Sequence, residues 1–223
     1  MPPILIAGLT GLFSGLLLSI PVGPVNLTIM NEGARRGFKF AVHVGLGAAL
    51  METIYCSIAF TGFAGFFGGE LVRAAMKVGS FFFMIILGLK FLLSHPDYKT
   101  AYVGGRLEKR MNPHSAFMTG FVRVMGNPGV LLNWIVLGAT FISHEWVLPN
   151  LACKAACIFG VAAGNCAWFF GVGYAVSRGY KKFSERTLLR MERGSGIGLL
   201  LLGVGIGCQI IWELARAARS HGM

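Results

Sequence analysis

Long apolar stretches alternate with short polar segments along the whole chain, and most charged residues lie in the polar segments. An α-helix needs about 20 mainly apolar residues to cross the hydrocarbon core of a bilayer, and the stretches have about this length. The pattern therefore predicts six transmembrane helices, at about residues 4–31, 40–67, 71–94, 115–143, 155–177 and 194–212.

The third predicted helix is the most highly charged. It contains Arg73, Lys77 and Lys90, but the stretch 78–89 is apolar. All three cations lie near the ends of the helix, where long side chains can reach the membrane surface. We therefore keep this stretch as a membrane span.

Composition also indicates a membrane protein. Apolar residues make up 55% of the 223 residues and charged residues 13%, whereas about a quarter of a typical globular chain is charged. So few charges cannot cover a soluble surface, which excludes a soluble enzyme. We predict an all-α integral membrane protein with a single transmembrane domain over residues 1–223. The first apolar stretch is too long for a cleaved signal peptide and is expected to remain as a span.

The distribution of Lys and Arg predicts the orientation. Of the 20 Lys and Arg residues, fourteen fall on one side of a six-helix arrangement and Arg123 lies within a span. The other five fall on the opposite side: Arg73, Lys77, Lys154, Arg216 and Arg219. Because cytoplasmic loops carry the excess of Lys and Arg, loops 95–113 and 178–193 are expected in the cytoplasm and both termini outside. The net charge of +11 therefore comes from loops and does not indicate a nucleic-acid partner.

The first span contains two prolines, Pro21 and Pro24, which predict a break in the helix. Proline has no backbone N–H group, and lipid cannot satisfy the carbonyl groups that lose their donors. A second half-helix would begin near Pro24 and present the backbone N–H groups of Val25 and Asn26. The positive end of a helix dipole suits an anionic group such as a carboxylate.

The fourth span repeats this feature at Gly126-Asn127-Pro128-Gly129. Three spans separate the two breaks, so the second half of the chain would be inverted relative to the first. Paired breaks in corresponding helices are typical of inverted-repeat transporters. We predict a 3+3 inverted repeat of residues 4–94 and 115–212, with a binding site between the breaks. The alternative is that the prolines only shape helix packing.

Several motifs together resemble a known family. They are Pro21-Val22-Gly23-Pro24-Val25-Asn26, then Met30-Asn31-Glu32-Gly33 with Arg35-Arg36, then Gly47-x-x-x-x-Glu52, and Gly120-Phe121 with Asn127-Pro128. This set resembles the LysE/RhtB family of amino-acid exporters over most of the chain. Two positions depart from the family pattern, because Glu52 stands where Asp is expected and Gly129 where Lys is frequent. The resemblance implies efflux of amino acids across a bacterial inner membrane, driven by an ion gradient.

Glu52 is an acidic residue near the middle of the second span. A charged residue at this depth costs roughly 2.5 to 3.5 kcal/mol on insertion scales, so it needs a partner or a wet cavity. Burial disfavours the charged carboxylate, which makes Glu52 a candidate for exchanging protons. The alternative is a protonated Glu52 that only forms a hydrogen bond to a neighbouring helix.

Arg123 is a second ionisable residue inside a span, one helical turn before Asn127. It is expected either to hold a substrate carboxylate or pair with Glu52, or to extend to the cytoplasmic surface. Asn165 is expected to join helices by hydrogen bonds. The predicted substrate-binding residues are Pro21, Gly23, Pro24, Val25, Asn26, Glu52, Arg123, Asn127 and Pro128, and Glu52 is also the predicted proton-coupling residue.

The five cysteines lie mostly in apolar stretches and have no disulfide or metal-binding spacing. Cys56 lies one turn from Glu52, and a thiolate there could bind a soft metal ion, so a heavy-metal exporter is one alternative function. A membrane thiol redox protein is a second alternative, which would need cysteines brought together across helices. No phosphate-binding loop, metal site or cofactor is predicted.

We therefore predict a transporter rather than an enzyme: a secondary exporter of amino acids or related small metabolites, coupled to proton antiport in the inner membrane. A homo-oligomer remains open, because Gly160-x-x-x-Gly164 and the glycine-rich last span offer faces for close helix packing.

Overall fold

The computed structural model describes residues 2–21, 23–62, 70–93, 115–178 and 185–221, and this part of the chain is helical without strands. The helices are α1 (Pro3–Ser19), α2 (Pro24–Arg36), α3 (Phe38–Gly62), α4 (Glu70–Leu93), α6 (Ala116–Met125), α7 (Pro128–Ser143), α8 (Leu151–Ser177) and α9 (Glu185–His221). The predicted all-α fold is confirmed.

Among the described residues, three helices are long and apolar enough to cross a membrane: α3 over Phe38–Thr61, α8, and α9 over Arg193–Trp212. Two bent pairs, α1 with α2 and α6 with α7, raise the number to five if each pair forms one span. The predicted third span corresponds to α4, which contains four charged residues and is not among these candidates. Six spans therefore remain a prediction.

Both breaks lie where the prolines predicted them. The chain turns by 73° between α1 and α2 and by 67° between α6 and α7. Pro24 and Pro128 occupy the first turns of α2 and α7, where a missing backbone N–H group costs no helical hydrogen bond. Proline thus starts the second half of each bent pair.

Two helix pairs approach closely through glycine. A methyl group on Gly11 of α1 would overlap the backbone of Cys157 on α8, and one on Gly47 of α3 would overlap the backbone of Phe117 on α6. Gly160 and Gly164 of α8 likewise face the backbone of α1. The Gly160-x-x-x-Gly164 face is therefore used for close helix packing inside this chain, as predicted, and a homo-oligomer stays a prediction.

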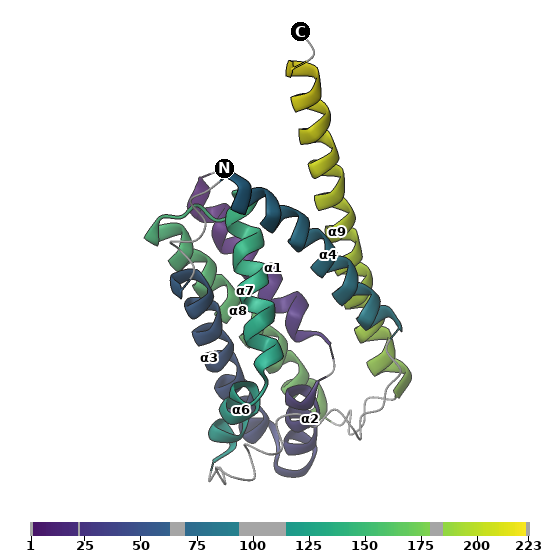
Figure 1. The fold of residues 1–223 in the computed structure, drawn as a ribbon. Coiled ribbons are helices and arrows are strands. Elements are labelled where there is room, and N and C mark those ends of the chain that lie inside the picture. The colour runs from purple at the N-terminus through teal and green to yellow at the C-terminus, as the bar shows by residue number, and fades with distance from the viewer. Residues whose placement is uncertain (1, 22, 63–69, 94–114, 179–184, 222–223) are drawn as a thin grey trace.

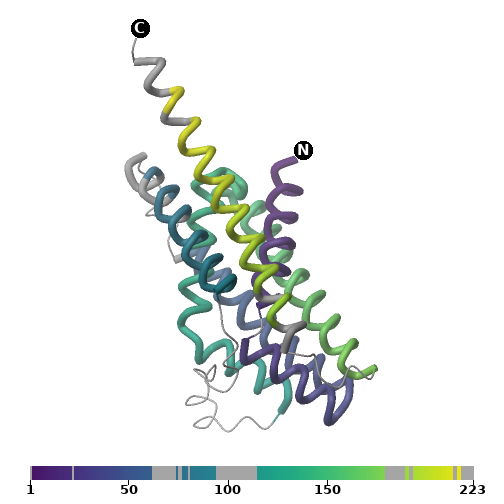
Figure 2. The backbone as a smooth tube through the Cα atoms, turned by 90° about the vertical axis from the view of Figure 1, so that its right-hand side faces the viewer, coloured from purple at the N-terminus to yellow at the C-terminus, as the bar shows by residue number. Residues whose placement is uncertain are grey.

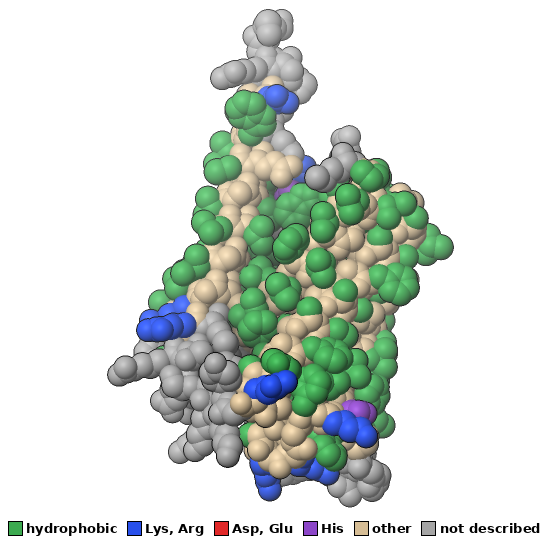
Figure 3. Space-filling view, turned by 180° about the vertical axis from the view of Figure 1, so that it is seen from behind, with side chains coloured by type: hydrophobic (Ala, Val, Ile, Leu, Met, Phe, Trp, Pro, Cys, Tyr) green, Lys and Arg blue, Asp and Glu red, His purple; other side chains and the backbone are tan. Residues whose placement is uncertain are grey.

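The first and last helices place both ends of the chain at the same end of the bundle, and α2 and α6 lie at the opposite end (Figures 1 and 2). Helices α4 and α9 pack along each other, and α9 extends past the rest of the bundle (Figure 1). Apolar side chains cover the middle of the face in Figure 3, with Lys and Arg toward its ends. This surface suits a lipid environment.

Candidate functional site at the broken helices

Asn26 compensates for the break in the first span. Its side-chain Nδ2 donates to the carbonyl oxygens of Ser19 at 2.8 Å and Pro21 at 2.9 Å. Its Oδ1 accepts a hydrogen bond of 3.1 Å from the indole Nε1 of Trp168 on α8. One buried amide thus replaces backbone donors that the break removes, at a depth where lipid offers none.

Glu52 is linked to this break through α8. Asn165 Nδ2 donates to Glu52 Oε2 at 2.9 Å, and Ser19 Oγ donates to Asn165 Oδ1 at 3.0 Å. We call these five residues the polar cluster: Ser19, Asn26, Glu52, Asn165 and Trp168. Ser19, Asn26 and Asn165 are buried, whereas Glu52 is half-buried. The predicted helix-joining residue, Asn165, thus connects α8 with α1 and α3.

Arg123 connects the two bent pairs. Its Nη1 donates from α6 to the Pro24 carbonyl oxygen at 3.0 Å and also to Thr28 Oγ1. The Thr28 hydroxyl in turn donates to the Pro24 carbonyl at 2.7 Å. The guanidinium group therefore contacts the first turn of α2 instead of extending along α6 toward the end of the bundle.

The starts of the two second half-helices differ. Asn127 Oδ1 accepts a hydrogen bond of 3.1 Å from the Gly129 N–H group and so caps α7. Helix α2 follows Gly23 and has no side-chain cap. Its first turn, with Pro24, Val25 and Asn26, remains the better candidate for a substrate carboxylate, because a free helix start presents backbone N–H groups.

The sequence analysis missed four residues that complete this region: Ser19, Thr28, Tyr55 and Trp168. Tyr55 lies nearly one helical turn after Glu52, and its hydroxyl donates to the Met125 carbonyl at 2.9 Å, where α6 ends. Ser19 stands two positions before Pro21, where the first proline motif begins, and this is a signal in the sequence. Nothing in the local sequence marks Trp168, because its partner lies 142 positions away.

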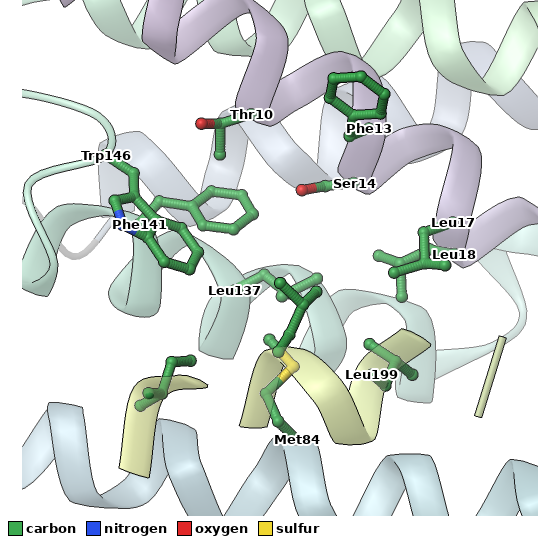
Figure 4. A pocket seen from close by; sticks show the side chains of 12 residues that line it. Thr10, Phe13, Ser14, Leu17, Leu18, Met84, Leu137, Phe141, Trp146 and Leu199 are labelled. Atoms are coloured by element: carbon green, nitrogen blue, oxygen red, sulfur yellow. The ribbon is translucent and has the colours of Figure 1, made fainter. Parts of the chain in front are cut away.

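An apolar cavity of about 200 Å³ lies between α1, α4, α7 and α9 (Figure 4). Thr10 and Ser14 of α1 contribute hydroxyl groups, and the other lining residues are apolar, among them Leu18, Met84 and Phe141. The cavity can receive an apolar group. Leu18 brings it next to the first break, but its walls come from distant segments and could not be predicted.

The remaining alternatives are not favoured. Among the described residues, His, Cys, Asp and Glu do not form a group of three that could hold a metal ion. All five cysteines are free thiols. The hypotheses of a heavy-metal exporter and of a thiol redox protein therefore gain no support from the part of the chain that the structure describes.

Comparison with protein families favours one of the functional classes that the sequence left open. The model of the LysE type translocators matches residues 16–210. The chain belongs to this family. LysE type translocators are membrane transport proteins, not enzymes, and the family motifs that the sequence resembles cover both broken helices.

Three relatives of this LysE-family chain illustrate its range, each 25% identical to it. The putative amino acid efflux protein YcgF of Bacillus subtilis aligns over 90% of this chain and 94% of its own length. The arginine exporter protein ArgO of Salmonella schwarzengrund aligns over 95% of this chain and 94% of its own length. The chemotactic transduction protein ChpE of Pseudomonas aeruginosa aligns over 88% of this chain and 94% of its own length. No solved structure matches the chain.

Proposed function

We propose that this chain is a secondary transporter that exports amino acids or related small metabolites across a bacterial inner membrane in exchange for protons. The observation that carries the proposal is the polar cluster, which joins Glu52 on α3 to the broken first span through Asn165 and Ser19. Membership of the LysE family and relatives named as amino-acid exporters support the substrate class.

The two charges of an amino acid each have a partner in this region. The carboxylate binds at the uncapped start of α2, where Val25 presents a backbone N–H group. Arg123, which contacts Pro24, adds positive charge beside the same turn. The ammonium group binds the Glu52 carboxylate. A proton that reaches Glu52 from outside displaces the ammonium group, because the two compete for one carboxylate, and so promotes release.

An inverted repeat accounts for the paired features of the two halves. Glycine contacts join α1 to α8 and α6 to α3, as expected if α1 corresponds to α6 and α3 to α8. Glu52 follows Gly47 by five positions, and Asn165 follows Gly160 by five. These two side chains form a hydrogen bond with each other, which supports a site between the repeats.

The decisive experiment uses purified protein in proteoliposomes with an imposed proton gradient and a panel of radiolabelled L-amino acids. We expect uphill transport of at least one amino acid by the parental protein. Glu52→Gln, which resembles the permanently protonated state, should abolish this transport. Glu145→Gln removes an exposed carboxylate near the end of α7 and serves as the matched control with parental transport.

Uphill transport by Glu52→Gln at the parental rate would assign Glu52 a structural role and place proton coupling elsewhere. If the parental protein transports no amino acid in the panel, the proposed substrate class is wrong.

A further inference from the structure

Glu52 accepts its hydrogen bond from a neutral amide, although a carboxylate inside a membrane binds a cation more strongly. The Asn165 Nδ2 group therefore occupies a donor position on Oε2 that an ammonium group would also take. Asn165 is fully buried, so its amide has no water to bind instead.

The orientation of the Asn165 amide is set by Ser19. An amide has a donor side and an acceptor side, and rotation by half a turn would point Oδ1 at Glu52. The Ser19 hydroxyl donates to Oδ1 at 3.0 Å and so keeps Nδ2 on the side of Glu52. Ser19 is the last residue of α1, and its carbonyl accepts the hydrogen bond from Asn26 across the break. The geometry of the break therefore determines which side of Asn165 faces Glu52.

We propose that Asn165 is a positioning residue that competes with the substrate's ammonium group for Glu52, and that Ser19 holds Asn165 in the competing orientation. The inference rests on the proposed function, in which Glu52 binds the ammonium group. It adds that movement of α1 relative to α2 changes the affinity of Glu52 for amines, because such movement displaces Ser19.

The test follows Glu52 directly and does not require a known substrate. Dicyclohexylcarbodiimide adds to carboxyl groups inside membrane proteins, and the resulting O-acylisourea either rearranges to the N-acylurea or is converted by methylamine to the N-methylamide with release of dicyclohexylurea. Mass spectrometry therefore counts both products as modified Glu52 in the purified full chain. Methylammonium is the probe, because it carries the ammonium group without any side chain. In Asn165→Ala the methylammonium concentration that halves the rate of modification should fall by about threefold to tenfold, the effect of losing one competing hydrogen bond.

Ser19→Ala leaves the amide in place but removes its orienting donor, and should lower the same concentration by about twofold. Ser19→Thr retains the hydroxyl group and should restore the parental value. The matched control is Thr53→Ala, because the Thr53 hydroxyl lies beside Glu52 in sequence but bonds the Ala49 carbonyl of its own helix. This control should give the parental value. If Asn165→Ala does not fold, as judged by size-exclusion chromatography, the Ser19 variants decide.

A purely structural role for Asn165 would give a different result. Loosened packing would also expose Cys157, which is buried beside α1, to a maleimide reagent. The proposal requires a change at Glu52 with unchanged Cys157 reactivity. An unchanged or higher protecting concentration in both variants, or no protection by methylammonium in any of them, would overturn it. Competition at Glu52 without amino-acid transport would instead leave this inference standing and contradict the proposed function.

Discussion

Arg123 lies on α6 close to the second break, yet its hydrogen bonds reach the first break. Its contacts with Pro24 and Thr28 hold the first turn of α2, the turn proposed to bind the substrate carboxylate. An arginine at this position is therefore expected to act on the proposed substrate site both by its charge and by fixing the helix start.

Replacing Arg123 separates these two effects. Arg123→Ala should stop transport and lower the stability of the protein by about 1.5 to 3 kcal/mol, because a partly buried hydrogen bond to a charged group is lost. Arg123→Lys keeps the charge without the planar group that bonds two acceptors, and should retain part of the transport. Thermal unfolding in detergent measures the stability of each variant, and efflux from proteoliposomes measures its transport.

Thr28→Val is the companion variant, because it removes the shared hydroxyl group and keeps Arg123. It should lower the Tm less than Arg123→Ala does and preserve transport. Parental Tm and transport in Arg123→Ala would mean that this arginine is dispensable at the break.

At the scale of helices, close packing of α1 on α8 depends on one face of α1. Gly11→Ala should lower the Tm strongly or prevent folding, because the added methyl group would overlap the carbonyl of Cys157, which is backbone and cannot move away. Gly8→Ala, one turn earlier, is the matched control. Its methyl group would find its nearest neighbour, the Ala156 carbonyl oxygen, at 3.8 Å, an ordinary contact distance.

Equal Tm values for the two alanine variants would show that α1 and α8 can move apart without loss of stability. Gly47→Ala should lower the Tm for the same reason, because Gly47 of α3 faces the backbone of Phe117 on α6.

Substitution of the prolines tests whether transport requires the break between α1 and α2. Replacing Pro21 and Pro24 together with Ala should restore the missing backbone N–H groups and allow a continuous helix. The Ser19 and Pro21 carbonyls would then bond within the helix, and Asn26 would lose both acceptors. We expect a folded protein without transport, measured by circular dichroism and efflux. Normal efflux by a well-folded double variant would reduce the prolines to packing features.

The sequence predicted what depends on local chemistry, and the structure added what depends on distant contacts. Proline without a backbone N–H group marks both breaks, and an acidic residue in an apolar stretch marks Glu52. The partner of Glu52, Asn165, lies 113 positions away. The sequence marks Asn165 as a polar residue that joins helices, but it does not show which residue Asn165 bonds. The contact of Arg123 with Thr28 crosses 95 positions in the same way. Such pairings follow from how the helices pack, which no local pattern contains.

At the scale of the whole molecule, the arrangement of the ends agrees with an even number of membrane crossings. The start of α1 and the end of α9 lie at one end of the bundle, and the turn between α2 and α3, with Arg35 and Arg36, lies at the other (Figure 1). Most of the loops predicted to be cytoplasmic, including Lys109 and Lys182, lie outside the described residues. The side on which each end lies therefore stays a prediction.

That prediction is tested by labelling single cysteines with an impermeant maleimide in intact cells, after Ser has replaced the five native cysteines. His144 lies in the connection between α7 and α8 but is buried, so a cysteine there would react poorly. Pro149 is exposed in the same connection between α7 and α8, and Arg35 is exposed at the opposite end. Because cytoplasmic segments carry the excess of Lys and Arg, Pro149→Cys should react in intact cells and Arg35→Cys only after permeabilisation. Reaction of Arg35→Cys in intact cells, with Pro149→Cys protected, would reverse the orientation and with it the direction from which protons reach Glu52.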